Sequence, residues 1–329
     1  MIRVAKLSYW HVHAWDYTKL AQQHPGTEIV AVWDELPERG REAAGKLGVP
    51  FHDDLDALLA DESIDAVIVD APTSMHHEVI GKAARAGKHI FTEKVVAPTL
   101  REVNSILRDV EQAGVKLTVS LPRLYDGYTQ TILPLIEQGV FGELTHVRVR
   151  LSHDGSLADW LPAHFYNAEQ TGGGAMIDLG CHPMYLTRLF LGLPEAVSSN
   201  YGRFTGREVE DNAVNSLHYA NGAIGIVEAG FVNAYAPFSI EIDGTEGSLV
   251  YGIGGNELKV RSKRRTNEWE TLPLADKLPP AFDQWVGHIE NGTEATDNIA
   301  MAIDLTKLME ASVKSAAEQR VVALRELEQ

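Results

Sequence analysis

The first 34 residues, MIRVAKLSYWHVHAWDYTKLAQQHPGTEIVAVWD (Met1–Asp34), place an amphipathic segment between two short apolar runs. The apolar runs, Arg3–Leu7 and Glu28–Trp33, predict β-strands, and the segment between them has helical periodicity. His24-Pro25-Gly26 is typical of the end of a helix. This order predicts a β-α-β unit, from which parallel sheets are built.

The same order continues to about residue 120. The further strands are predicted at Val49–His52, Ala66–Val69, His89–Thr92 and Lys116–Val119. We therefore expect residues 1–120 to form a Rossmann-like α/β domain with a doubly wound parallel sheet of six strands. In such a sheet, ligands bind beyond the carboxyl ends of the strands, near the point where strand order reverses.

The pattern changes after residue 120. The expected elements are helices over 125–138, from about residue 174 and over 296–319, a long strand over 143–152, and short strands between 197 and 260. Ala220-Asn221-Gly222 is typical of a hairpin turn. Residues 121–329 are therefore expected to form an α+β domain with a largely antiparallel open sheet.

Composition narrows the class of protein. The chain has 46 acidic against 29 basic residues, a formal net charge of −17, which disfavours nucleic acid and anionic membranes as partners. One cysteine, Cys181, excludes an internal disulfide. No apolar run approaches the roughly 18–20 residues that span a membrane, and no signal peptide is apparent. We expect a cytoplasmic protein.

The loop after the first predicted strand lacks the glycines of a dinucleotide fingerprint. Gly-x-Gly-x-x-Gly permits a tight turn and close approach of a pyrophosphate, but the three positions here hold Ser8, Trp10 and His13. The helix N-terminus behind the loop still offers N–H groups to an anion. The candidate cofactor contacts of this loop are Ser8, Tyr9, Trp10, His11 and Val12.

Two acidic residues end predicted strands, Asp34 the second and Asp70 the fourth. Asp34 stands at the position where dinucleotide-binding domains place an acidic residue that accepts hydrogen bonds from the adenosine ribose. Its alternative role is to cap the helix that begins near Pro37. A carboxylate there favours NAD over NADP, which stays possible, because it repels a 2′-phosphate. Asp70 ends the fourth strand, and we expect it to pair with Lys6, whose ammonium would otherwise be buried alone.

Two further motifs bring chemical groups together. Phe91-Thr92-Glu93-Lys94-Val95-Val96-Ala97-Pro98 places a Glu-Lys pair at the carboxyl edge of the sheet. Gly172-Gly173-Gly174-Ala175-Met176-Ile177-Asp178-Leu179-Gly180-Cys181-His182 opens a helix with Asp178 and His182 four residues apart, hence on one face. Its glycines let another backbone or a ligand come close.

Together these motifs resemble the Gfo/Idh/MocA family of oxidoreductases. Pro72-Thr73-Ser74-Met75-His76, Gly244-Thr245-Glu246-Gly247 and the closing helix extend the resemblance to nearly the whole chain. The departures are the missing glycines and Val95, where the family has proline. The resemblance implies an NAD(P)-dependent dehydrogenase or reductase of a sugar, cyclitol or related polyol.

The resemblance also implies site residues. Lys94 would contact the substrate hydroxyl and the cofactor, Asp178 would orient the substrate, and His182 would be the general acid/base, a role that suits an imidazole. Pro72, His76, Asp34 and Glu93 are the remaining cofactor candidates. The substrate candidates are Arg123, Tyr125, His153, Trp160 and His164.

Three alternatives stay open. Several histidines are expected at one cleft. Some of His153, Asp178, His182 and a first-domain histidine would suit a divalent metal. The sequence has no compact metal-binding motif, however, and we do not predict a metal site. The altered loop also allows a lyase, epimerase or glycosidase-like activity with altered or absent nucleotide binding. The third alternative is a sugar-binding protein without activity, which would not need Lys94, Asp178 and His182 together.

The open sheet is expected to pair with a second copy, in a homodimer or homotetramer.

Overall fold

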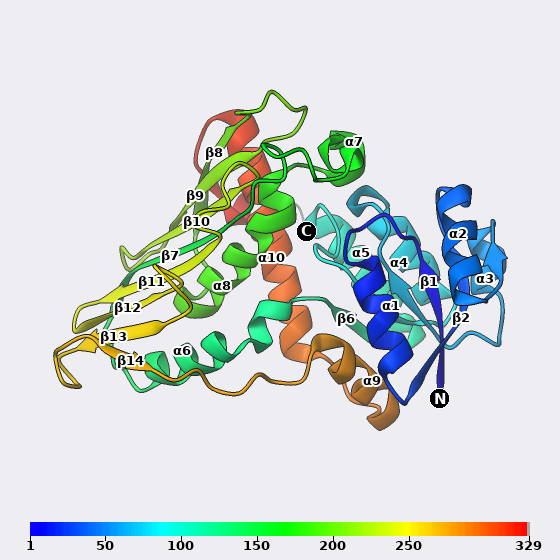
Figure 1. Cartoon of the computed structure of the whole chain (residues 1–329), viewed down its shortest axis with the longest axis horizontal. Coiled ribbons are helices and arrows are strands. Elements are labelled where there is room, and N and C mark those ends of the chain that lie inside the picture. Colours follow the sequence, from blue (N-terminus) through cyan, green and yellow to red (C-terminus); the bar gives the residue numbers. More distant parts are fainter. Residues whose placement is uncertain (328–329) are drawn as a thin grey trace. The chain divides into compact units, whose positions relative to one another are not determined.

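The computed structural model describes residues 1–327, which fall into two compact units (Figure 1). The first comprises Met1–Leu121 and Pro279–Ile303, and the second comprises Pro122–Leu278 and residues 304–327. The division differs from the expected domains in one respect, because residues 279–303 join the first unit.

A six-stranded parallel sheet in the order β3-β2-β1-β4-β5-β6 forms the centre of the first unit. Its strands are β1 (Ile2–Leu7), β2 (Thr27–Trp33), β3 (Phe51–His52), β4 (Ala66–Val69), β5 (His89–Thr92) and β6 (Leu117–Val119). The order reverses between β1 and β4, which confirms the predicted doubly wound sheet. All four residues of β4 are buried, as a strand covered on both faces requires.

Helices connect these strands. They are α1 (Ala14–Gln23), α2 (Pro37–Leu47), α3 (Leu55–Leu59), α4 (His76–Arg85) and α5 (Leu100–Ala113). Thr99 begins α5 with a capping box to Glu102, and Gly114 ends it in the left-handed conformation. Because β1, β4 and β5 are parallel neighbours, the loops that follow them lie at one edge of the sheet.

The helix α9 (Ala281–Asn291) explains why residues 279–303 belong to the first unit. Phe282 and Trp285 are almost fully buried, and both rings contact Phe91 of β5, at centroid distances of 5.4 and 5.8 Å. Asn298, in the first part of α10 (Thr296–Glu318), exchanges two hydrogen bonds with the backbone of Val119 in β6.

A nine-stranded sheet in the order β14-β13-β12-β11-β7-β10-β9-β8-β15 dominates the second unit. Its strands are β7 (Leu144–Ser152), β8 (Ala196–Gly202), β9 (Asn212–His218), β10 (Ile224–Gly230), β11 (Phe238–Gly244), β12 (Gly247–Tyr251), β13 (Leu258–Ser262), β14 (Glu270–Leu272) and β15 (Val322–Ala323). Of its neighbouring pairs, β7 and β10 are parallel and the rest are antiparallel. The predicted hairpin joins β9 to β10, with Gly222 at φ +83°.

Helices cover one face of this sheet. The unit contains α6 (Gly127–Glu137), α7 (Ala168–Thr171), α8 (Cys181–Leu191) and the later part of α10. Figure 1 shows α8 along the sheet, where it contacts β7 and β10. Among the described residues, no helix is long and apolar enough to cross a membrane.

Candidate active site

The loop between β1 and α1 uses its own backbone amides internally. The amide of Tyr9 donates to Asp34 Oδ2 (2.8 Å), and that of Trp10 donates to Ser8 Oγ (3.0 Å). The His11 amide donates to the Asp70 carbonyl, and the His13 amide to His11 Nδ1, both at 3.2 Å. These four loop amides therefore have protein partners, and the predicted anion contact at the N-terminus of α1 (Ala14–Gln23) stays a prediction.

The side chains of this loop differ in how far they are buried. Ser8 is fully buried at φ +75°, a left-handed conformation that glycine would adopt without strain. Tyr9 packs with Ala14 and Val32 in the core, and Trp10 is also buried. Val12 is 44% exposed. Of the five predicted cofactor contacts, only Val12 is freely exposed to solvent.

Asp34 already has four hydrogen-bond donors. Oδ1 accepts from the Leu36 amide (2.8 Å) and Arg39 Nη2 (2.7 Å), and Oδ2 accepts from the Tyr9 amide and Arg39 Nε (2.9 Å). A carboxylate has about four lone-pair sites, so these donors saturate it. Asp34 is not the N-cap of α2 either, since Leu36 holds that position. Its side chain fixes the β1–α1 loop and Arg39.

The adjacent Glu35 has a different environment. Its Oε1 accepts from Arg39 Nη2 at 2.5 Å, whereas its buried Oε2 has no hydrogen-bond partner in the described part of the chain. Burial and the charge of Asp34 raise the pKa of Glu35, against the opposing effects of Ser8 and Arg39. Sequence reasoning missed Glu35, because the spacing rule points to the residue that ends the strand.

The predicted Lys6–Asp70 ion pair is present beneath this edge of the sheet. Both side chains are fully buried, and Lys6 Nζ donates to Asp70 Oδ2. Burial lowers the pKa of Lys6 well below its ordinary value, while Glu93 and Asp34 act in the opposite direction. The ammonium also lies 5.2 Å from the centre of the Tyr9 ring, so the pair supports the loop above it.

His76 joins the loops that follow β4 and β5. Pro72 begins a 3₁₀ turn (Thr73–Met75) that leads into α4, and the buried His76 is the first residue of that helix. Its Nδ1 lies 2.7 Å from the Val95 carbonyl, and its Nε2 lies 3.0 Å from the Ala71 carbonyl. Burial lowers the pKa of His76, although both carbonyls oppose this shift. The ring is therefore a clamp between two loops.

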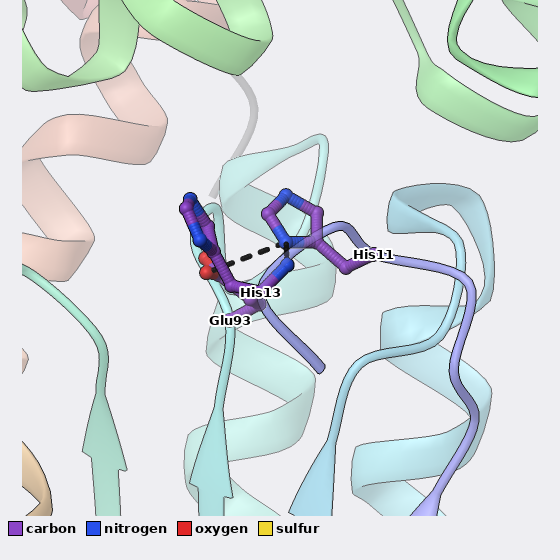
Figure 2. A group of neighbouring side chains, drawn as sticks. All are labelled: His11, His13 and Glu93. Carbon is purple, nitrogen blue, oxygen red and sulfur yellow. Dashed lines mark hydrogen bonds and ion pairs between the residues drawn. The ribbon is translucent and has the colours of Figure 1, made fainter. Parts of the chain in front are cut away.

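Glu93 and Lys94 are both almost completely buried. Glu93 Oε1 accepts from the Tyr17 hydroxyl (2.5 Å), and Oε2 accepts from the Lys94 amide (2.7 Å). Burial favours a higher pKa for Glu93, but His11, Lys94 and His13 outweigh it and lower the value to about 2. Figure 2 shows Glu93 with the two histidine side chains directed toward it. The Lys94–Val95 peptide is cis.

In the second unit, the glycine motif lets two backbone segments touch. A Cβ on Gly174 would overlap the Glu210 carbonyl oxygen. That carbonyl accepts from the Ala175 amide (2.8 Å), and Glu210 Oε1 accepts from the Met176 amide (3.0 Å). This confirms close backbone approach as one reason for the glycines.

The helix that follows begins differently from the prediction. Residues Met176–Gly180 form a π-helical turn, and α8 starts only at Cys181. Asp178 therefore lies in the π turn and His182 in the first α-helical turn. The four-residue spacing in an ordinary α-helix does not describe their relation, and π turns are common at functional sites.

His182 is held by a tyrosine that sequence reasoning missed. Its buried ring has Nδ1 3.0 Å from the Tyr185 hydroxyl, and the same hydroxyl accepts the Arg123 amide at 3.0 Å. The second lone pair of the hydroxyl oxygen can accept from Nδ1–H, and its own hydrogen can instead donate to an unprotonated Nδ1, so the direction of this bond follows the tautomer of His182. The tautomer protonated at Nδ1 is the one that leaves a lone pair on Nε2, where a general base needs it. Three-residue helical spacing is the only sequence signal for this contact.

A second histidine in this unit lies near Asp178. The His153 ring stacks on Phe231 (4.8 Å between centroids, 7° between planes) and contacts the half-exposed Trp160 at 4.7 Å. Its Nδ1 accepts from the Gly155 amide at 3.0 Å. Burial lowers the pKa of His153, while Asp178 and Asp154 oppose this effect. His153, Trp160 and Asp178 therefore belong to one neighbourhood.

The other predicted substrate residues occupy separate places in the second unit. The Arg123 guanidinium stacks on Phe238 (4.4 Å) and donates to the Tyr128 hydroxyl (3.3 Å). Arg123 and Tyr125 lie in a 3₁₀ turn (Pro122–Tyr125), and the Tyr125 carbonyl accepts from the Leu278 amide. His164 lies in the 3₁₀ turn Ala163–Tyr166. Lys94 belongs to the first unit, and Asp178 and His182 to the second.

Known protein families match both units. "Oxidoreductase family, NAD-binding Rossmann fold" matches residues 12–121, and "GFO/IDH/MocA C-terminal domain" matches residues 129–250. The scyllo-inositol 2-dehydrogenase (NAD(+)) of Bacillus subtilis is 30% identical over 260 residues, which are 77% of this chain and 72% of that protein.

Two further relatives extend the comparison. The D-xylose dehydrogenase of Paenarthrobacter nicotinovorans is 27% identical over 316 residues, 83% of this chain and 81% of that protein. The crystal structure of an NAD-binding protein from Listeria innocua superimposes with a TM-score of 0.83 at 26% identity, covering 98% of this chain and 96% of that one. The chain belongs to the Gfo/Idh/MocA family of oxidoreductases, and its first unit is the family's NAD-binding Rossmann domain.

Proposed function

We propose that this protein transfers hydride between NAD(H) and a carbinol carbon of a sugar, cyclitol or related polyol, with NADP(H) as a possible second cofactor. The observation that carries the proposal is the His182–Tyr185 contact in the helix that follows the glycine motif. The Bacillus subtilis and Paenarthrobacter nicotinovorans relatives are dehydrogenases, which supports redox chemistry over the lyase, epimerase or glycosidase-like alternative.

The proposed roles follow from the reaction. A hydroxyl must lose its proton as hydride leaves the same carbon, and His182 Nε2 accepts that proton while Nδ1–H donates to Tyr185. The Lys94 ammonium stabilises the developing alkoxide, and Asp178 orients the substrate. Bound NAD⁺ supplies the hydride acceptor. In the opposite direction, His182 returns the proton to the carbonyl oxygen.

The residues of the first unit fit a dinucleotide at its ribose end. Asp34 has no remaining lone pair, but Glu35 Oε2 is buried without a protein donor among the described residues. A ribose hydroxyl would supply one. We therefore assign the ribose contact to Glu35 and leave Asp34 to hold the loop. Val12, Pro72, His76 and Glu93 are proposed to line the rest of the cofactor site, together with Ser8, Tyr9, Trp10 and His11.

The substrate is proposed to contact the His153 neighbourhood. The exposed Trp160 offers an aromatic face, which suits the apolar face of a sugar ring. His164, Arg123 and Tyr125 are proposed to contribute at its margins. We also propose a cytoplasmic location, and a homodimer or homotetramer that pairs through the sheet of the second unit.

The test measures cofactor binding and turnover separately. Calorimetry with NAD⁺, NADH, NADP⁺ and NADPH is expected to show binding of at least one, and NADH absorbance follows the oxidation of inositols and pentoses. On an accepted substrate, His182→Asn should lower kcat by about 100-fold or more, the contribution of general acid–base catalysis.

The control is His218→Asn, because His218 is an exposed histidine at the end of β9. It should retain the rate of the unchanged protein. Failure to bind any of the four dinucleotides would refute the proposal, and full turnover by His182→Asn would remove that residue from the mechanism.

A further inference from the structure

Three metal-ligating side chains converge at the carboxyl edge of the first unit's sheet. His11 and His13 come from the loop between β1 and α1, and Glu93 follows β5. Figure 2 shows the three side chains directed toward one another. Each offers one nitrogen or oxygen atom, and these atoms all lie within 4.8 Å of each other.

The contact between His11 and Glu93 joins two atoms that could both be ligands of one metal ion. His11 Nδ1 accepts the His13 amide (3.2 Å), so this atom presents a lone pair. The same atom lies 3.5 Å from Glu93 Oε1, which belongs to a carboxylate and can only accept. In the neutral ring no proton joins these two acceptors, and a cation between them would bind to both, as a protonated His11 ring pairs with the carboxylate.

The geometry suits a small divalent ion. Metal–nitrogen and metal–oxygen bonds of about 2.0–2.2 Å give a tetrahedral edge of about 3.4 Å. The observed 3.5 Å between His11 Nδ1 and Glu93 Oε1 matches that edge. Two imidazoles and one carboxylate are also the ligand set of zinc sites that keep a fourth position open.

Neighbouring residues orient two of the ligands. Asp16 Oδ2 lies 3.2 Å from His13 Nδ1, which directs Nε2 of that ring to a metal. Tyr17 donates to Glu93 Oε1 and holds the carboxylate. Glu93 and His11 are buried, whereas the His13 side chain is 48% exposed, so an ion can enter past His13.

We propose that His11, His13 and Glu93 bind one divalent transition-metal ion of the Zn²⁺ class, with a water molecule or solute oxygen in the fourth position. The ion takes the His11 lone pair that the His13 amide holds in its absence. This site lies wholly in the first unit, shares His11 and Glu93 with the proposed cofactor site, and does not include the proposed proton-transfer residues Asp178 and His182.

The experiment uses the full chain, stripped with a chelator and free of dinucleotide, so its result does not depend on the proposed hydride transfer. Calorimetry with Zn²⁺ should show one ion per chain, and Co²⁺ should give the intense visible absorption of a tetrahedral site. His13→Asn, at a half-exposed position, should weaken Zn²⁺ binding by tenfold or more and abolish that absorption. Asp16→Asn should weaken binding by about tenfold through its effect on His13.

The matched control is His77→Asn, a partly exposed histidine of α4 in the same unit, which should bind Zn²⁺ as the unchanged protein does. Circular dichroism checks that each variant is folded. Absence of one-to-one binding, or equal binding by His13→Asn, would overturn the site. Loss of binding in His182→Asn with binding retained in His13→Asn would also overturn it, by moving the ion to the second unit.

Discussion

Asp34 and Glu35 are neighbours in sequence with opposite hydrogen-bonding states. The four donors on Asp34 make it part of the scaffold, and the unpartnered Oε2 of Glu35 makes that oxygen the one able to gain a bond. The end of β2 thus carries two acidic residues, of which Asp34 is fully hydrogen-bonded and Glu35 is the one proposed to contact the ribose.

Glu35→Met should therefore weaken NADH binding by roughly tenfold or more, because a hydrogen bond to a charged group contributes about 1.5–3 kcal/mol. Glu38→Met is the control, since Glu38 is exposed in the first turn of α2. Calorimetry gives the dissociation constants. Equal affinity in Glu35→Met and the unchanged protein would return the ribose role to another residue.

The Lys6–Asp70 pair gives a prediction about stability. Lys6→Met leaves the Asp70 carboxylate buried and uncompensated, which should lower the free energy of unfolding by about 3–5 kcal/mol. The double variant Lys6→Met with Asp70→Leu removes both charges and should recover most of that loss. Urea unfolding measures all three proteins. A single variant as stable as the unchanged protein would show that the pair contributes nothing.

At the scale of elements, the predicted strands agree with β1 to β6 to within two residues, because each apolar run is bounded by glycine or a helical pattern. Helix α9 was not predicted, because its aromatic residues pack against Phe91 of β5, almost 200 positions earlier in the sequence. The π turn before α8 was missed for a similar reason. Its shape depends on Glu210, which holds the amide of Met176 from a distant segment.

In the candidate site too, the residues of short motifs were predicted and the contacts from distant segments were not. Lys94, Asp178 and His182 follow from motifs within short stretches. The Tyr185 hydroxyl that contacts His182 also accepts the Arg123 amide, which comes from another element and was not predicted. The occupied amides of the β1–α1 loop were not predictable, because Asp34 and Asp70 reach them from two other strands.

The loop after β7 carries a pH-dependent prediction. The folded protein lowers the pKa of His153, so the neutral ring is favoured by folding. The stabilisation is present above the ordinary value of 6.5 and is lost as the pH falls below it, because the unfolded chain binds the proton first. Partial exposure of the ring keeps the effect small.

NMR of the protein labelled at histidine should therefore give His153 a titration midpoint below 6.5. His153→Asn identifies the signal by its disappearance, and the Asn oxygen preserves the acceptor for the Gly155 amide. A midpoint at or above 6.5 would show that Asp178 and Asp154 outweigh burial.

At the scale of the molecule, one face of the second unit's sheet carries no helix of residues 1–327, as Figure 1 shows. Val214 of β9 is on that face, because the adjacent Ala213 and Asn215 are buried and Asn215 contacts Ser312 of α10. The face also holds a hollow of about 310 Å³ lined by Arg150, Val214 and Glu228 among others. Pairing with a second copy would cover it.

Val214→Glu should therefore shift the protein from a dimer or tetramer to a monomer in light scattering coupled to size-exclusion chromatography. Val313→Glu is the matched control, because Val313 on α10 has a similar exposed fraction, 40% against 36% for Val214. A monomer of the unchanged protein would exclude this pairing.

The assignment of residues 279–303 to the first unit has a consequence for synthesis in the cell. A ribosome makes the chain from its N-terminus, so every strand from β7 to β14 is made before Trp285 and Asn298 exist. Until then, Phe91 lacks the aromatic cover of α9, and the Val119 backbone lacks its amide partner. The unit that begins first is therefore completed late in translation. While most of the second unit is made, the six-stranded sheet lacks its contacts with Trp285 and Asn298.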